Sequence, residues 1–416
     1  MFVLAGTLTP MHRRAFLAST AGLAVAPNPA WLQFPASSGD PAFDGWLRDF
    51  TDRAVAAGWS RSALAEIFAG LSPDASVVAA DHRQPELSKP MGDYLSGIVS
   101  ESRIGAGRNR RKDMGGWLGR MTERTGVPAE IVVAIWGVES NFGQNQGSSD
   151  VIRSLATLAA DGRRRQWAEE QLLSALKILT SGEARRDQLT GSWAGAMGQT
   201  QFTPQDYLAW AVDEDDDGRR DIWRSAYDAL GSAANFLARK AAWRRGKSWA
   251  REVALPPGFD YSLAEGARQT PTEWGVLGVR TADRLAWSAA DLMEPTQLIL
   301  PQGWSAPAFL VFPNHMAIRT YNNSTAYALA VGLYADRIGG APALVQSWPQ
   351  DQPISYADRM AAQSALAKLG FDPGEPDGII GLKTRAAARA WQKARGFPAD
   401  GYLSYGLIQE LKAQAG

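Results

Sequence analysis

The sequence contains no cysteine and only three histidines, at positions 12, 82 and 315. Without cysteine the chain cannot form disulfides, thiolate nucleophiles or cysteine-based metal sites, and it has no lipobox cysteine to carry a lipid anchor. So few histidines, far apart in sequence, are poorly suited to a zinc peptidase or a Ser-His-Asp hydrolase. An excess of one charge is also missing, because 43 Lys and Arg residues balance 43 Asp and Glu residues. We therefore expect no nucleic-acid partner.

The chain does have enough apolar sequence for a large core. Its 416 residues are 45% hydrophobic, which predicts two or three folded domains. We place an export signal and leader at 1–38, a large domain at 39–340, a linker at 341–355 and a small module at 356–416. The linker prediction depends on a stretch rich in Gly and Pro that starts at Gly339.

The N-terminus resembles an export signal. Residues 12–17, His-Arg-Arg-Ala-Phe-Leu, are similar to a twin-arginine motif, and a short apolar stretch of small residues continues to Ala26. That stretch is too short to span a bilayer, so we expect no transmembrane segment after the signal is removed. The true start is Met1 or Met11, and the alternative interpretation is an apolar tail that is not cleaved. We predict a soluble, exported protein of the periplasm.

The spacing of apolar residues predicts a mainly α (α+β) fold. Segments 41–70 and 84–124 carry apolar residues at helical spacing. Between about 252 and 312 the pattern changes to short runs broken by Pro and Gly, such as 275–279 and 297–300. Such runs favour a small β-rich insertion within the helical domain.

One expected helix is apolar on most sides and ends near a glutamate. The residues from Pro128 to Val138 are mostly apolar, Pro128 suits a first helical turn, and Glu139 comes just before the turn Ser-Asn-Phe-Gly. Apolar surroundings disfavour the charged carboxylate, so this group can stay protonated near neutral pH and donate a proton to a glycosidic oxygen. A glutamate near a helix end is more often a surface or capping residue. The catalytic interpretation of Glu139 therefore depends on other segments of the sequence.

A second segment, 191–204, is dense in small residues with polar groups among them: Gly-Ser-Trp-Ala-Gly-Ala-Met-Gly-Gln-Thr-Gln-Phe-Thr-Pro. Small residues let a backbone approach a ligand closely, and Ser192, Gln199 and Gln201 can hydrogen-bond to sugar hydroxyls or to the carboxylate. The alternative is tight helix packing. With Glu-Ser-Asn-Phe-Gly at 139–143, this segment closely resembles the membrane-bound lytic murein transglycosylase B family, and the resemblance extends over roughly 41–340.

The resemblance implies a lysozyme-like helical catalytic domain in which Glu139 is the sole catalytic acid and base. It also implies that Ser192 and Gln201 orient the glutamate and the substrate. One position departs from the family, because Phe236 stands where a tyrosine is common. The histidine that often precedes a later Gly-Trp is also absent. Four further residues match substrate-binding positions: Tyr94, Tyr321, Asn322 and Tyr327.

The implied activity is that of a lytic murein transglycosylase, a lyase that cleaves the β-1,4 bond between N-acetylmuramic acid and N-acetylglucosamine in peptidoglycan without water. The product carries 1,6-anhydro-N-acetylmuramic acid ends. Ordinary glycosidases need two carboxylates, whereas intramolecular attack by the C6 hydroxyl lets one suffice. No cofactor is required for this chemistry. Two alternatives are a hydrolytic muramidase, for which we find no second carboxylate in comparable context, and a non-catalytic peptidoglycan-binding protein.

The acidic segment 213–221 has the spacing of a calcium loop, with carboxylates at positions 1, 3, 5 and 9 and glycine at position 6. Position 12 is an arginine and not the bidentate glutamate of an EF-hand, so the pattern is only partly met. The family resemblance favours a structural calcium, and the alternative is an acidic surface loop paired with its own two arginines. The expected ligands are Asp213, Asp215, Asp217 and Asp221.

The C-terminal module holds three short helical patterns between 356 and 413 and strongly resembles the peptidoglycan-binding domain type 1. Its Asp-Gly pairs at 377–378 and 400–401 form turns, and Thr384 is expected near the start of a helix. A three-helix bundle is implied, with Trp391 in a structural role. Its expected partner is the glycan strand of peptidoglycan.

Overall fold

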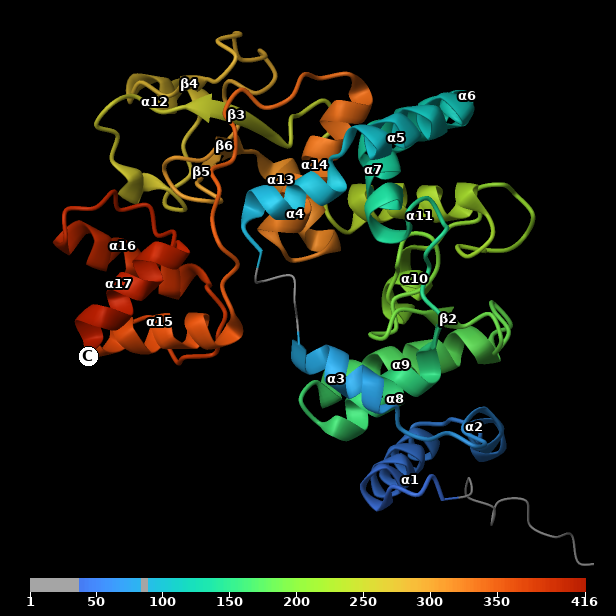
Figure 1. The fold of residues 1–416 in the computed structure, drawn as a ribbon. Coiled ribbons are helices and arrows are strands. Elements are labelled where there is room, and N and C mark those ends of the chain that lie inside the picture. The colour runs from blue at the N-terminus through green and yellow to red at the C-terminus, as the bar shows by residue number, and fades with distance from the viewer. Residues whose placement is uncertain (1–36, 84–88) are drawn as a thin grey trace, which may run out of the picture.

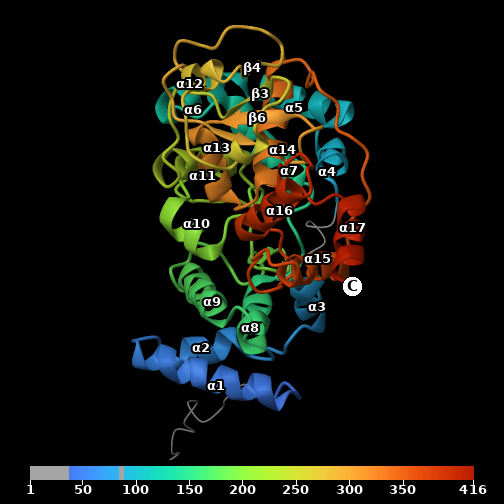
Figure 2. The same ribbon diagram turned by 90° about the vertical axis from the view of Figure 1, so that its left-hand side faces the viewer.

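A computed structural model gives the structure of residues 37–83 and 89–416, so the predicted export signal lies almost entirely outside the described residues. The described part is mostly helical with small antiparallel sheets, which confirms the predicted fold class (Figure 1). Two views show an elongated arrangement, with helix α1 (Pro41–Ala56) at one end and strand β4 (Arg280–Thr281) at the other (Figures 1 and 2). None of the described helices has both the length and the apolar character that crossing a bilayer requires.

The N-terminal helices begin at capping residues and bury apolar faces. The carboxylate of Asp40 accepts the N–H groups of Ala42 and Phe43, and Pro41 occupies the first turn of α1. The hydroxyl of Ser60 caps the next helix in the same way. The helices that follow α1 are α2 (Arg61–Ile67), α3 (Ala75–Arg83), α4 (Met91–Ile98), α5 (Glu101–Asp113) and α6 (Gly115–Thr125).

The centre of the main core is the contact between α7 (Ala129–Ser140) and α14 (Thr325–Gly339). The middle of α7 is buried on all sides, as its sequence predicts. Gly137 lets the two helices approach, because a Cβ there would lie 2.8 Å from Cε1 of Tyr334 and 3.0 Å from Cζ of Phe142. Helix α7 therefore has little freedom to shift along its neighbour.

More helices and a two-stranded sheet continue the main core. Strands β1 and β2 pair antiparallel, and their register places Ser149 opposite Gly191. Because β2 leads directly into the segment 191–204, this pairing sets where that segment starts. The elements are β1 (Ser149–Asp150), α8 (Val151–Asp161), α9 (Arg165–Thr180), β2 (Thr190–Gly191), α10 (Pro204–Trp210), α11 (Ala226–Arg239) and α13 (Pro313–Tyr321).

The predicted β-rich insertion is a four-stranded antiparallel sheet with its own small core. The run 297–300 forms a strand as predicted, but the run 275–279 does not. It holds the end of helix α12 (Pro271–Val276) and the turn after it, because Thr270 and Glu273 form a capping box that starts a helix just before. The strand order is β4, β3 (Ala250–Ala254), β6 (Ala308–Val311) and β5 (Gln297–Ile299).

The C-terminal module is the predicted three-helix bundle, and Trp391 is fully buried in its core, which agrees with a structural role. The module packs against the β-rich insertion. Glu265 of the insertion pairs with Arg385, at 2.8 Å, and with Arg389. All three side chains are mostly buried, so the module has a defined docking site. Its helices are α15 (Tyr356–Lys368), α16 (Leu382–Ala394) and α17 (Tyr405–Ala415).

Replacing Gly137→Ala tests the tight contact between α7 and α14. Although alanine is the better helix former, the added methyl group meets Tyr334 and Phe142, so we expect the free energy of unfolding to fall by about 1–3 kcal/mol. Urea denaturation followed by circular dichroism measures this change.

The matched control is Gly105→Ala in α5, where a Cβ would meet nothing within 4 Å. There we expect the free energy of unfolding to rise by up to about 1 kcal/mol. Equal effects of the two substitutions would contradict the tight contact.

Candidate active site

Glu139 lies in the last turn of α7, where the backbone makes an unusual turn. Asn141 and Phe142 follow with φ of 49° and 60°, so two consecutive residues other than glycine are left-handed. The hydroxyl of Ser140 donates to the carbonyl of Gln199 at 2.6 Å and accepts the N–H of Gly143 at 2.8 Å. These bonds hold a strained turn directly beside the carboxyl group, as is common at functional sites.

Gln199 joins the segment 191–204 to α7. Its Oε1 accepts the indole N–H of Trp136 at 2.9 Å, one turn before Glu139, and its Nε2 donates to the carbonyl of Trp223 at 3.3 Å. Gly143 leaves room for this amide, because a Cβ there would lie 2.6 Å from Gln199 Oε1. The sequence shows Gln199 as a polar residue among small ones, but only the structure shows that it positions the glutamate helix.

The carboxyl group of Glu139 is largely desolvated and has one hydrogen-bond donor among the described residues. Burial raises its pKa from 4.5 to about 7, and the hydrogen bond from the hydroxyl of Tyr327, at 2.6 Å, opposes part of that rise. Among the described residues, burial and the hydroxyl of Tyr327 are the two causes that set the pKa of Glu139. The carboxyl group of Glu139 can therefore keep its proton near neutral pH.

Two stacked tyrosines support this arrangement. The ring of Tyr321 lies parallel to that of Tyr327, with centroids 6.5 Å apart and planes 9° apart, and its hydroxyl donates to the carbonyl of Thr200 at 2.7 Å. Burial raises the pKa of both phenols well above the ordinary value, so both stay neutral donors. Phe236 packs edge-on to Tyr321 with centroids 5.0 Å apart. The departure from tyrosine thus places an apolar ring behind the pair.

The structure brings some of the predicted site residues together and leaves others apart. Tyr94 on α4 lies close enough to Tyr327 to raise its pKa. The hydroxyl of Ser192 accepts the N–H of Ala196, and the amide of Gln201 donates to the carbonyls of Gln146 and Gly198. Within the described ranges neither side chain hydrogen-bonds to the glutamate. Asn322 is exposed just after α13, so its binding role stays a prediction.

The acidic loop gathers four carboxylates whose oxygens lie within 4.8 Å of one another: Asp213, Asp215, Asp217 and Asp228. The first three are predicted ligands. Left-handed φ angles at Asp216 and Gly218 turn the loop back on itself. Four anionic groups at this distance repel one another unless a cation lies between them, so the donor set suits a hard divalent cation such as calcium.

Asp221 lies outside this group, so its role as a ligand stays a prediction. Its carboxylate instead accepts the N–H groups of Trp223 and Arg224 and caps the turn that follows. Asp228, which was not predicted, belongs to the group and is fully buried at the start of α11, where it accepts the N–H groups of Glu214 and Asp221. The sequence signal for Asp228 is its position three residues after Ser225, which caps that helix, and not loop spacing.

Comparison with known proteins places the two parts of the chain in known families. Residues 42–336 match the transglycosylase SLT domain, and residues 355–411 match a peptidoglycan binding domain. The membrane-bound lytic murein transglycosylase B of Escherichia coli strain K12 is 33% identical over 222 residues. That alignment covers 51% of this chain and 58% of the relative, so the chain matches less than two thirds of the relative's length.

Two solved structures extend the comparison. Pseudomonas aeruginosa SltB3, in complex with NAG-anhNAM-pentapeptide, is 47% identical with a TM-score of 0.85, covering 90% of this chain and 100% of SltB3. Escherichia coli Slt35, in complex with calcium, is 26% identical with a TM-score of 0.64. That match covers 76% of this chain and 98% of Slt35.

The raised pKa of Glu139 predicts a pH-dependent cost to stability. The folded pKa of about 7 exceeds the unfolded value of 4.5, so the folded state binds the proton more tightly. Stability from this group is therefore complete below about pH 4.5 and is lost as pH rises through 7, by roughly 3 kcal/mol. Glu139→Gln removes this cost and should be more stable than the parent at pH 8.

Urea denaturation of both proteins at pH 4 and pH 8 measures the effect, because all other titrating groups are shared and cancel in the difference. We expect the stability advantage of the variant to grow by roughly 3 kcal/mol between the two pH values. A difference that does not change with pH would show that Glu139 titrates normally.

Proposed function

The chain belongs to the transglycosylase SLT family, and on that premise we propose that it is a lytic murein transglycosylase with Glu139 as its catalytic acid and base. The observation that carries this proposal is the isolated, desolvated carboxyl group of Glu139 with its pKa near 7. The substrate is the glycan strand of peptidoglycan. The bond that breaks is the β-1,4 bond on the reducing side of N-acetylmuramic acid.

Cleavage starts with the protonated form of Glu139. It donates its proton to the glycosidic oxygen as the bond to the anomeric carbon breaks, and the acetamido group of the substrate assists at that carbon. The carboxylate then accepts the proton of the C6 hydroxyl, whose oxygen attacks the anomeric carbon and closes the 1,6-anhydro ring. A pKa near the working pH suits a group that must both give and take a proton.

In this mechanism Tyr321 and Tyr327 position the carboxyl group of Glu139. Tyr327 donates to Oε1 of Glu139, which fixes the carboxyl orientation and leaves Oε2 for the substrate. Tyr321 holds Tyr327 by stacking and is itself tied to Thr200. We assign both residues positioning roles, and keep direct contact with substrate as a proposal for Tyr94, Ser192, Gln201 and Asn322.

The single carboxyl group favours a transglycosylase over a hydrolytic muramidase. A hydrolase needs a second carboxylate as base or nucleophile, and none among the described residues influences the pKa of Glu139. The ligand of SltB3 also carries an anhydro sugar, the product type of this mechanism. The C-terminal module would bind the same polymer beside the catalytic domain. Such a substrate, together with the signal-like N-terminus, supports a periplasmic location.

Mass analysis of muropeptides released from purified sacculi tests the activity and the role of Glu139 together. We expect products lighter by one water with 1,6-anhydro ends, and a loss of at least about 1000-fold in rate for Glu139→Gln, because the proton donor is removed. Reducing ends would instead identify a hydrolase. Binding without any release would identify a wall-binding protein.

We also propose that the acidic loop binds a structural calcium. Asp213, Asp215, Asp217 and Asp228 would hold it, and the ion would neutralise their repulsion and join the loop to the start of α11. No step of cleavage depends on it. The calcium complex of Slt35 supports the proposal.

Thermal unfolding with calcium and with chelator tests this loop. At calcium about 100-fold above Kd, binding should add about 2.7 kcal/mol of stability and raise the melting midpoint. Asp228→Asn should remove that shift. Asp221→Asn is the matched control, because it removes a neighbouring carboxylate outside the group and should keep the shift. No shift in the parent protein would contradict calcium binding.

A further inference from the structure

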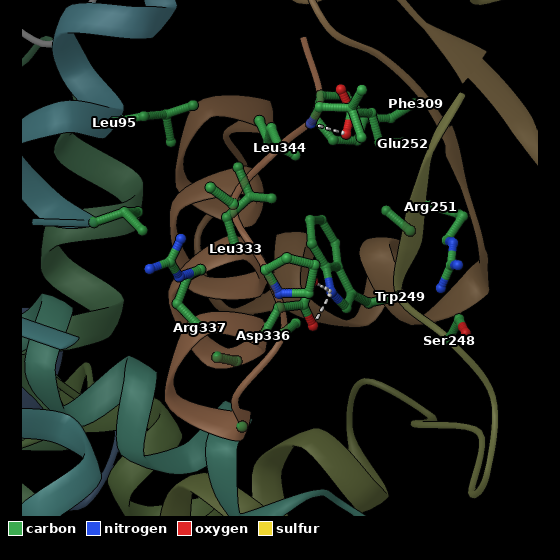
Figure 3. A pocket seen from close by; sticks show the side chains of 18 of the residues that line it. Leu95, Ser248, Trp249, Arg251, Glu252, Phe309, Leu333, Asp336, Arg337 and Leu344 are labelled. Atoms are coloured by element: carbon green, nitrogen blue, oxygen red, sulfur yellow. Dashed lines mark hydrogen bonds between the residues drawn. The ribbon is translucent and has the colours of Figure 1, made fainter. Parts of the chain in front are cut away.

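A cavity of about 770 Å³ is lined by residues at the start of α7 and near the end of α14, away from Glu139. Figure 3 shows its lining from close by. The cavity is lined by the C-terminal half of α14, the start of α7, α4, β3 and the segment 341–348. Neither Glu139 nor Tyr327 lines it. The lining residue Ile131 precedes Glu139 by roughly 12 Å along the helix axis. Its volume is within the range that accommodates small ligands.

Nearly all charged groups in the lining already have strong partners. Arg251 pairs with Asp283 at 2.7 Å, and the carboxylate of Glu252 accepts the N–H groups of Val345 and Gln346 at 2.8 and 2.9 Å. Three further lining residues are in ion pairs: Glu130 with Arg111, Lys247 with Glu294, and Arg337 with Glu101.

Asp336 is the exception. Within the described part of the chain its carboxylate has no ion pair, and its only donor is the indole N–H of Trp249, at 3.2 Å from Oδ1 and 3.1 Å from Oδ2. Figure 3 shows these two side chains directed toward each other in the middle of the cavity. A carboxylate has about four acceptor positions, so most of the acceptor capacity of Asp336 is unused. Such a group attracts a cation that brings several donors.

Much of the remaining lining of the cavity is apolar, although serine side chains such as Ser96 and Ser248 also contribute to it. The side chains of Leu95, Leu333, Phe309 and Leu344 come from four different segments and line the part of the cavity above the Asp336–Trp249 pair in Figure 3. Two backbone hydrogen bonds to Glu252 hold the segment 341–348 against the cavity. Apolar walls with one carboxylate suit a ligand that has an alkyl body and a cationic end.

We propose that this cavity binds a primary ammonium group on an alkyl chain, with Asp336 as its counter-ion and the apolar walls around the chain. An ammonium group supplies three donors, and the indole of Trp249 lies beside the site where the cation would sit. Two sources share this chemistry, namely a free alkylamine and an amino group on a peptide of the cell wall. The second source rests on the proposed function, whereas the site itself does not.

The titration of Asp336 sets the pH dependence of binding. Desolvation raises its pKa to about 7, while Trp249 and Arg251 oppose the rise and Glu130 adds to it. The ammonium group stays charged up to about pH 10. Binding therefore needs the ionised carboxylate, strengthens as pH rises through 7, and releases a proton below that value. The other charged groups that face the cavity are Lys247, Glu252, Asp283 and Arg337.

Isothermal titration calorimetry with n-butylamine tests the site in the Glu139→Gln variant, so that cleavage plays no part and failure of the proposed activity stays separate. We expect saturable binding that is about 30-fold weaker at pH 5.5 than at pH 8, and no binding of 1-butanol. Asp336→Asn should weaken binding by about 10- to 100-fold. Ser96→Ala, which changes an uncharged lining side chain, should leave binding unchanged.

A muropeptide with a free amino group and the same muropeptide after acetylation distinguish the two sources. Tighter binding of the free amine, lost in Asp336→Asn, identifies the wall peptide as the ligand, and binding of n-butylamine alone identifies a free alkylamine. If Asp336→Asn does not fold, the proposal is tested by the pH dependence of n-butylamine binding to the protein that retains Asp336. Equal binding at both pH values, or no saturable binding of any amine, would overturn the proposal.

Discussion

The contact between α7 and α14 is the constraint on which the rest of the structure depends. Gly137 lets the two helices approach closely enough for Tyr327 to reach Glu139, and that hydrogen bond joins residues 188 positions apart. The same contact helps to bury Glu139, and this burial raises the pKa of its carboxyl group. At the other end, the two helices contribute Ile131 and Asp336 to the cavity of Figure 3. One pair of helices therefore positions two buried carboxyl groups with different surroundings, Glu139 and Asp336.

The candidate active site holds the carboxyl group of Glu139 in surroundings whose lack of solvent destabilises the charged form. Desolvation raises the pKa of Glu139, and the protein limits that rise with one phenol and no positive charge. An arginine at the same place would stabilise the carboxylate and abolish the acid. The strained turn after the helix and the amide of Gln199 hold the group in position. In the proposed mechanism, a pKa raised in this way suits a group whose proton must leave and return.

Several features could be predicted from sequence because they depend on local order. The apolar helix and the short strand at 297–299 follow from the spacing of residues, whereas the three-helix module with its buried Trp391 was implied by the resemblance of the C-terminal segment to a known domain. The choice of Glu139 came from the resemblance of its motif to a known family. A family motif reflects contacts between distant residues, and the spacing of apolar residues does not. The spacing of apolar residues wrongly suggested β structure at 275–279, because a capping box just upstream starts a helix there. It was also incomplete in the acidic loop, where Asp228 approaches from a helix outside the motif.

The sequence by itself determined the mainly helical class and the order of the parts, and its motifs singled out Glu139 as the candidate catalytic residue. Only the tertiary structure decided the roles of Tyr327 and Gln199, the carboxylates that meet in the acidic loop, and the lone Asp336 in its cavity. The physical reason is that burial and long-range contact set the pKa and the partners of a polar group. Neither can be read from nearby residues, since the partners come from distant segments that only folding brings together.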